Sequence, residues 1–433
     1  DNSISATATE VDIHFEWDGA DSWIRILDNG IGMDDAELET AMRLGAKDLR
    51  TPRAKTDLGR FGMGLKTASF SQARRLTVAS RRKDQHLVCL RWDLDRLSEG
   101  DGSGWPLFEG PNEGSEARLA PMNSVSLGTL VLWELMDRVV TEGFTAQHMI
   151  DLSDQVEAHL AMTFHRLLEA GELVLRINSK KVVPWDPFLA GHPGKAKETP
   201  EYRLVGNLEV TVQAHVLPHR DLLKAPEIEA AAGPAGWTSQ QGFYIYRNRR
   251  LLVAGGWLGL GDHGRAWTRD EAHRLARIRL DIPNSADADW KINVLKSTAS
   301  PPVIVRHQLK RIASETREAA RTVFAHRGRV ATSGSAKVGG MPDLWDTVKN
   351  RKGTSYRISR DHDLVASLLE RAGPLKADVL ALLRLVEETV PVQRIWLDTA
   401  EDRETPSTGF VTAATEDMRA PLSALFRALV QHS

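Results

Sequence analysis

The fold of this chain is decided by the stretch Trp23-Ile24-Arg25-Ile26-Leu27-Asp28-Asn29-Gly30-Ile31-Gly32-Met33. Its first half is apolar and predicts a strand, and Asp-Asn-Gly then supplies strong turn chemistry. Glycines at 30 and 32 let the backbone pass close to a flat ligand, and the Asp28 carboxylate can accept a hydrogen bond from an exocyclic amine. Met33 would pack on the face of such a ring. A plain turn after a strand explains the same residues nearly as well, so the stretch needs support from elsewhere.

That support starts with a second glycine-rich stretch, Gly59-Arg60-Phe61-Gly62-Met63-Gly64-Leu65-Lys66-Thr67, which leads into a helix predicted from Lys66 to Ser71. Glycine-rich backbone at a helix start presents free N–H groups to phosphate oxygens. The stretch is not a P-loop, because Leu65 interrupts the contiguous Gly-Lys-Thr of that motif, and a dinucleotide fingerprint would need a third glycine. A tight loop at a helix start is the structural alternative.

Gly128 and Thr129 begin a third informative segment, a strand predicted from Gly128 to Trp133. The threonine hydroxyl could bond the edge of a base or a water beside it. Alone this signal is weak, because β-branched threonine simply suits strands. Asn2 lies at the start of the chain, in a segment that we expect to be helical.

The order and spacing of these segments resemble the motif set of the GHKL ATPases, the superfamily that contains gyrase, the large heat-shock chaperones, sensor histidine kinases and MutL. The resemblance covers at least Asp1 to about Lys296, and its second motif is most similar to MORC- and MutL-type members. It implies an α+β fold: a GHKL (Bergerat) α/β sandwich that binds nucleotide, followed by a transducer-like α/β domain and a C-terminal helical region.

The resemblance also implies roles for individual residues, with ATP and Mg²⁺ as the cofactors. Asp28 would recognise the adenine amino group, Thr129 would make the second adenine contact, and Asn2 would coordinate the Mg²⁺ that bridges the phosphates. The remaining expected residues are the adenine-pocket wall, Gly30, Gly32 and Met33, and the phosphate end, Gly59, Gly62, Gly64, Leu65 and Lys66.

Three further parts of the machinery follow from the same resemblance. The segment from Arg43 to Arg60 would be the ATP lid. Lys296, with Lys291 in reserve, resembles the transducer lysine that senses the γ-phosphate. The glutamate that activates water in the family lies one helical turn, about 3.6 residues, before the asparagine. We therefore expect that catalytic glutamate upstream of Asp1, and ATP hydrolysis is implied by the resemblance alone.

The length of 433 residues exceeds the size at which one hydrophobic core usually stops growing, so several domains are expected. We expect an N-terminally truncated GHKL ATP-binding domain at 1–140 and a transducer-like domain at 141–330. A Gly- and Ser-containing stretch at 331–340 predicts a linker, and 341–433 should be a mainly helical region.

Composition excludes several classes of protein. No apolar run approaches the roughly 18 residues of a membrane span, so no membrane partner is expected. A single cysteine, Cys89, excludes an internal disulfide framework or a multi-cysteine zinc site and fits a cytoplasmic location. The formal net charge is only −2, so affinity for nucleic acid would have to come from local patches. One such patch is the arginine-rich run Gln241–Arg250, which could contact phosphates or could cap a sheet edge with solvated charge.

The expected function is that of a Mg-dependent ATPase whose ATP-gated lid closure and homodimerisation drive a DNA transaction. The resemblance to prokaryotic MORC-like proteins implies partners in restriction or anti-phage defence. A chaperone-like ATPase and a non-catalytic ATP-binding scaffold remain as alternatives. A histidine kinase is disfavoured, because His165 follows the nucleotide-binding region instead of preceding it.

Overall fold

The chain divides into two compact units, Asp1–Val330 and Ala331–Ser433. The computed structural model describes residues 1–43, 64–96, 106–194, 197–204, 207–283, 289–292, 299–325, 344–350 and 353–392. Several expected features fall outside these residues, namely Gly59, Gly62, Lys296, most of the lid and the linker at 331–340.

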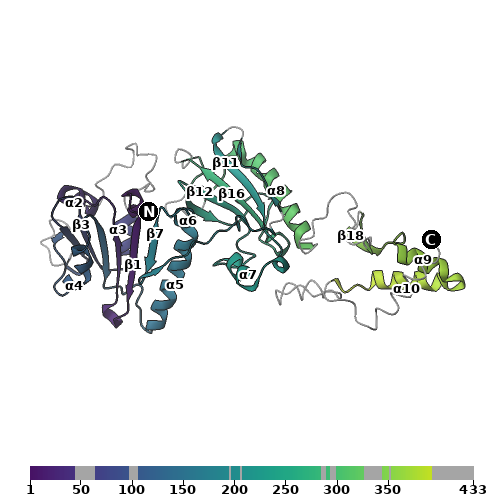
Figure 1. The fold of residues 1–433 in the computed structure, drawn as a ribbon, viewed down its shortest axis with the longest axis horizontal. Coiled ribbons are helices and arrows are strands. Elements are labelled where there is room, and N and C mark those ends of the chain that lie inside the picture. Colours follow the sequence, from purple (N-terminus) through teal and green to yellow (C-terminus); the bar gives the residue numbers. More distant parts are fainter. Residues whose placement is uncertain are drawn as a thin grey trace. The chain divides into compact units, whose positions relative to one another are not determined.

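The first unit opens with an eight-stranded sheet in the order β5-β4-β3-β6-β2-β1-β7-β8 (Figure 1). Its neighbouring strands are antiparallel except for β1 and β7, which are parallel. The strands are β1 (Glu10–Glu16), β2 (Trp23–Asp28), β3 (Arg75–Arg81), β4 (Val88–Asp93), β5 (Phe108–Glu109), β6 (Gly128–Glu134), β7 (Val174–Ile177) and β8 (Lys180–Lys181).

Helices cover both faces of this sheet, as strand β6 illustrates. Leu130 and Leu132 pack with Leu119 and Met122 on one face. Val131, between them, belongs to the opposite layer, because successive strand residues point to opposite faces. The helical elements are α1 (Asn2–Ser5), α2 (Asp35–Met42), α3 (Gly64–Phe70), α4 (Glu116–Leu119), α5 (Ala146–Thr163) and α6 (His165–Glu169), with 3₁₀ turns η1 (Gly19–Asp21) and η3 (Ala120–Asn123). The result is a mixed α/β sandwich.

Local signals explain where these helices begin and end. Helix α2 starts with a capping box, in which the Asp34 side chain accepts from the Glu37 N–H and the Glu37 side chain accepts from the Asp34 N–H. The spacing at 145–170 predicts one helix, but the chain forms α5 and α6, separated at Phe164. The backbone of Phe164 departs from helical geometry, and its ring is buried in the core. Burial of this aromatic ring stabilises the fold more than an unbroken helix would.

The first sheet continues past residue 140, where we expected the nucleotide-binding domain to end. Strand β7 pairs with β1 through Val11 and Leu175, and α5 packs Met149 into the same apolar cluster as Phe15. The polypeptide thus returns to the N-terminal sheet after helix α5 before it enters the second sheet.

The second sheet has the order β10-β11-β16-β12-β13, with β9 also paired to β11. Its core contains Trp290, which is fully buried, and Leu309 on the covering helix α8. The helix spans Val303–Ala325, a stretch rich in both charge signs for which the sequence pattern predicts a helix over about the same residues. The elements of this part are β9 (Lys197–Glu198), β10 (Tyr202–Leu204), β11 (Asn207–Val216), η4 (Arg220–Leu222), α7 (Ala225–Ala232), β12 (Gly242–Arg247), β13 (Arg250–Ala254), β14 (Gly261–Asp262), β15 (Arg265–Ala266), η5 (Glu271–His273) and β16 (Ala276–Ile282).

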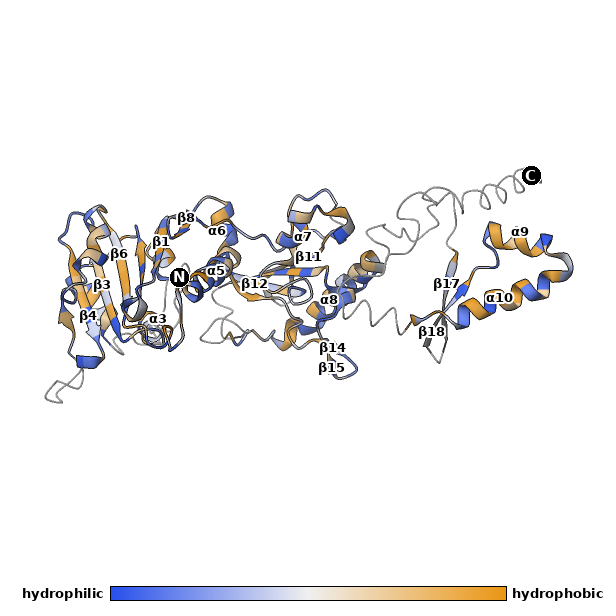
Figure 2. Cartoon of the chain, turned by 90° about the horizontal axis from the view of Figure 1, so that it is seen from below, coloured by the Kyte–Doolittle hydropathy of each residue, from blue (hydrophilic) through white to orange (hydrophobic). Residues whose placement is uncertain are grey.

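The second unit contains a β-hairpin that the sequence analysis did not predict. Its elements are β17 (Trp345–Asn350), β18 (Gly353–Ile358), α9 (Asp363–Arg371), η7 (Gly373–Leu375) and α10 (Lys376–Glu388). Figure 2 shows apolar and polar residues interleaved along α9 and α10. Among the described residues of the whole chain, no helix combines the length and apolar character that crossing a bilayer requires.

Glycine geometry supplies a stability prediction for the second sheet. A Cβ added at Gly242, where φ is +109°, would lie 2.1 Å from the Gly256 carbonyl oxygen, whereas at Gly143 (φ +82°) it would meet nothing within 4 Å. Gly143→Ala should therefore lower the free energy of unfolding by about 1–2 kcal/mol through φ strain alone. Gly242→Ala should lower it by about 3 kcal/mol or more, because the clash is with backbone. Urea denaturation of both variants measures the difference; equal losses would contradict the argument.

Candidate functional site

Asp28, the last residue of β2, is a buried carboxylate with donors from three segments. Its Oδ1 accepts from the Gly30 N–H at 2.9 Å and from the Thr129 N–H at 3.3 Å, and its Oδ2 accepts from the Ser3 hydroxyl at 2.7 Å. Only 8% of the residue is exposed. A buried carboxylate is tolerated only when it is hydrogen-bonded, so these donors hold its orientation. The structure thus brings together helix α1, the glycine turn and the start of β6.

A second hydroxyl cluster lies beside it and includes a residue that the sequence analysis missed. Ser80, buried at the end of β3, accepts from the Met33 N–H at 2.9 Å. Its hydroxyl lies 2.9 Å from the Thr129 hydroxyl and donates to the Gly128 carbonyl oxygen at 3.1 Å. The available signal was a serine that follows the apolar residues of a strand. Ser80 therefore joins the glycine turn to Thr129.

The two glycines of the turn are required by close packing. A Cβ at Gly32, where φ is +68°, would lie 2.0 Å from the Arg81 carbonyl oxygen. At Gly30 it would lie 2.8 Å from the Ala6 carbonyl oxygen, which also accepts from the Ile31 N–H. The turn therefore lies against the end of α1 on one side and against β3 on the other.

Asn2, the expected magnesium ligand, begins helix α1. Its side chain is exposed, and the next residue, Ser3, binds Asp28. An amide oxygen is the kind of hard ligand that suits Mg²⁺, so the donor chemistry at this position fits the expected ion. The structure places Asn2 one residue from a partner of Asp28.

Lys66, expected at the phosphate end, is held by backbone carbonyls. Its ammonium donates to the Ala41 carbonyl oxygen at 3.0 Å and to that of Arg43, and the side chain is 4% exposed. These carbonyls end helix α2, where a cation complements the helix dipole. Leu65 and Met33 both pack against the apolar cluster that contains Leu38. Lys66 thus links α3 to α2, and its contact with phosphate stays a prediction.

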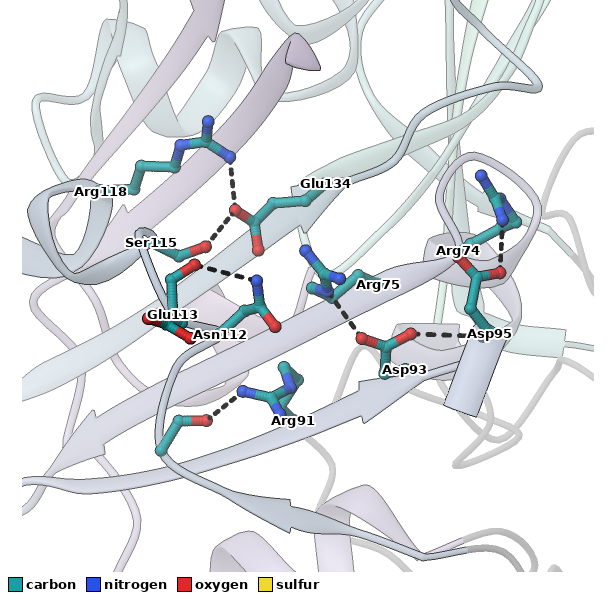
Figure 3. Close-up of polar contacts among 11 residues, drawn as sticks. Arg74, Arg75, Arg91, Asp93, Asp95, Asn112, Glu113, Ser115, Arg118 and Glu134 are labelled. Atoms are coloured by element: carbon teal, nitrogen blue, oxygen red, sulfur yellow. Dashed lines mark hydrogen bonds and ion pairs between the residues drawn. The ribbon is translucent and has the colours of Figure 1, made fainter. Parts of the chain in front are cut away.

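A separate polar cluster lies around the far ends of β3, β4 and β6 (Figure 3). Glu134, only 2% exposed, accepts from the Ser115 hydroxyl at 2.6 Å and from Arg118 at 2.5 Å. Arg75 donates to Asp93 at 2.8 Å. Glu134 and Thr129 lie at opposite ends of β6, about 17 Å apart at the usual rise of a strand. We interpret this cluster as structural ion pairing, remote from Asp28.

A basic pocket of about 540 Å³ lies between the β14–β15 hairpin and the start of α8. Lys310 pairs with Asp262 at 2.9 Å, and Arg306 donates to the Gly259 carbonyl oxygen at 2.8 Å. Arg265 and His307 also line the pocket, and no carboxylate is among its lining residues. The pocket therefore offers positive charge on the second sheet's side of the first unit.

The position of Lys66 supplies a prediction. Lys66→Met should lower the free energy of unfolding by about 1–3 kcal/mol, because buried carbonyls would lose a charged donor. Lys83→Met, at an exposed lysine, is the control and should be nearly neutral. Chemical denaturation measures both. Unchanged stability of Lys66→Met, together with weaker nucleotide binding, would argue that the ammonium serves the ligand and not helix α2.

Comparison with known proteins agrees with this geometry for the N-terminal part of the chain. A search of curated proteins found no match. Residues 1–113 match the family model described as histidine kinase-, DNA gyrase B-, and HSP90-like ATPase. The matched segment contains Asn2, Asp28 and Lys66 but ends before Thr129. The N-terminal segment is therefore similar to GHKL-type ATPases, which supports ATP binding by this domain.

Proposed function

We propose that this protein binds Mg-ATP at the Asp28 cluster and that the full-length protein hydrolyses it. The observation that carries the proposal is the hydrogen bonding of Asp28. Within the part of the chain that the structure describes, its Oδ2 accepts one bond, from Ser3. A carboxylate oxygen can accept two, so Oδ2 retains capacity for the amino group of adenine. A rigidly held acceptor at the end of a strand, next to a glycine turn, is suited to hydrogen-bond to the edge of a flat base.

The phosphates would extend from this acceptor toward helix α1 and the glycine-rich stretch that ends at Gly64. Asn2 would hold Mg²⁺, which when bound neutralises negative charge on the phosphates. Gly59 and Gly62 would leave backbone N–H groups free for phosphate oxygens. Lys296 would contact the γ-phosphate from the second sheet's side. Each role extends the family resemblance to a residue of this chain.

We further propose that ATP drives closure of the lid and pairing of two chains. A ligand has to bind the closed state about 10⁴-fold more tightly, roughly 5 kcal/mol, to move the protein from mostly open to mostly closed. Charge-assisted contacts to a γ-phosphate, which ADP lacks, are of suitable strength. From the resemblance of the second glycine-rich motif to MORC-type proteins, we propose a MORC-like ATPase that acts on DNA in restriction or anti-phage defence. The guanidinium groups of Arg265 and Arg306, which line the basic pocket, support the DNA part of this proposal.

Three measurements separate this proposal from its alternatives. Phosphate release by the native full-length protein distinguishes an ATPase from a scaffold that only binds ATP. Affinity for duplex DNA that falls steeply with added salt distinguishes a DNA-acting protein from a chaperone-like one. Suppressed aggregation of an unfolded client, without a response to DNA, would favour the chaperone.

Asp28→Asn provides the direct test of the adenine site. The amide oxygen can still accept from Gly30 and Thr129, and the amide N–H can donate to Ser3, so the thermal midpoint should change little. The acceptor for adenine is lost, and affinity for Mg-ATP should fall at least about 100-fold, roughly 2.7 kcal/mol. Isothermal titration calorimetry measures this.

Asp21→Asn is the matched control, because Asp21 is an exposed carboxylate on the 3₁₀ turn before β2. It removes the same charge and should leave the affinity for Mg-ATP unchanged. Binding by Asp28→Asn that equals that of the unsubstituted protein would refute the proposed site, and so would a full-length protein that gives no saturable heat with Mg-ATP.

A further inference from the structure

The hairpin of β12 and β13 carries two arginines from the second sheet to the N-terminal domain. Asn248 and Arg249 form its two-residue turn, with φ of +47° and +67°. Positive φ at both positions matches the turn that tight hairpins prefer. Arg249 contacts Glu172 at 2.5 Å and donates to the Arg166 carbonyl oxygen at 2.9 Å. Arg250, the next residue, contacts Asp1 at 2.5 Å.

The pair of Arg250 and Asp1 is more shielded from solvent than most ion pairs among the described residues. The side chains are 13% and 22% exposed, and Arg250 also lies near the Phe164 ring. Burial lowers the pKa of Arg250 to about 10, so the guanidinium remains charged at neutral pH. A largely buried charge that loses its partner is strongly destabilising. Arg250 therefore depends on its ion pair with Asp1. Within the arginine-rich run Gln241–Arg250, this arginine is not a solvated charge that caps a sheet edge.

Helix α1 is anchored on both sides of Asn2. Asp1 binds Arg250 of the second sheet, and Ser3 binds Asp28 of the first sheet. Asn2 lies between these two anchors. The expected magnesium ligand thus lies between a polar contact to the second sheet and a polar contact to the first sheet.

We propose that Arg250 is a positioning residue for the nucleotide site: through Asp1 it sets the orientation of helix α1 and hence the affinity for Mg-ATP. This inference rests on the proposed function for its nucleotide part. Binding free energies are linked reciprocally, so Mg-ATP held at Asn2 would in turn tighten the contact between Asp1 and the hairpin. The second sheet would sense the nucleotide through α1 as well as through any lysine that reaches the γ-phosphate.

The test uses Arg250→Gln in the full-length protein, with two readouts. The first is hydrogen–deuterium exchange without nucleotide at the amides of Ser5, Ala6 and Ala8, which bond to carbonyls of residues 1, 2 and 3. Exchange at these amides should become about tenfold faster. The second is Mg-ATP affinity, which should fall about tenfold, while nucleotide without Mg²⁺, held mainly at Asp28, should be affected less.

Arg249→Gln is the matched control, because it removes the same charge from the same hairpin but breaks contacts to Glu172 and Arg166. It should leave both readouts near those of the unsubstituted protein. Asp1→Asn should change exchange and affinity as Arg250→Gln does. The double variant should show no larger change than either single variant, since both substitutions remove the same contact between Arg250 and Asp1. Arg250→Lys should restore part of the protection and of the affinity, which a simple loss of folding would not allow.

Two outcomes would overturn the inference. One is an Arg250→Gln protein with unchanged exchange and unchanged affinity, and the other is an equal effect of Arg249→Gln, which would indicate general hairpin docking. Failure of the proposed function looks different: the unsubstituted protein would then bind no Mg-ATP, while faster exchange in Arg250→Gln would still establish the contact that holds α1. If the unsubstituted protein binds no Mg-ATP and exchange in Arg250→Gln is also unchanged, the proposed function and the inference about Arg250 are both refuted.

Discussion

The N-terminal domain depends on one constraint, the buried carboxylate of Asp28, which has to be hydrogen-bonded at the end of its strand. Its donors come from positions 3, 30 and 129, so satisfying one side chain brings together segments that are far apart in the sequence. The approach is so close that a Cβ at Gly128 would lie 2.0 Å from the Asp28 carbonyl oxygen. Glycine at 128 is therefore required by the close approach of the β6 backbone to the end of β2, the same approach that brings the Thr129 N–H to the Asp28 carboxylate.

Local signals made much of the fold predictable. Strands β2 and β6 follow apolar stretches that are evident in the sequence, and the bounds of α8 agree with its pattern because an amphipathic repeat runs through all of it. The break at Phe164 and the pairing of β7 with β1 were not predictable, because both depend on tertiary contacts. The β17–β18 hairpin was missed, although Asn350 and Gly353 favour a turn, because Trp345–Asn350 shows no regular alternation of apolar and polar residues.

Residues of the candidate site were likewise predictable where a motif identifies them, and not where their role depends on tertiary contacts. Asp28 and Thr129 were identified because a motif preserves residue type and order, and the structure brings these two residues together. Ser80 was missed because its contribution depends on strand register: β3 pairs Ser80 with Thr129 across the sheet. Lys66 was identified from its motif, yet its contacts with α2 carbonyls depend on how two helices pack, which one-dimensional spacing does not encode.

Helix α1 shows how a small element can connect two sheets. Its position comes from contacts with its surroundings: Ile4 packs against the apolar cluster of the first sheet, and flanking side chains add polar contacts. Asp1 and Ser3 supply these contacts to different sheets, and neither contact involves Asn2. A ligand held at Asn2 would therefore act on an element with a polar anchor on each side. Because Asn2 lies between the two anchors, binding at this residue would be coupled to both of them, and each anchor would in turn affect binding.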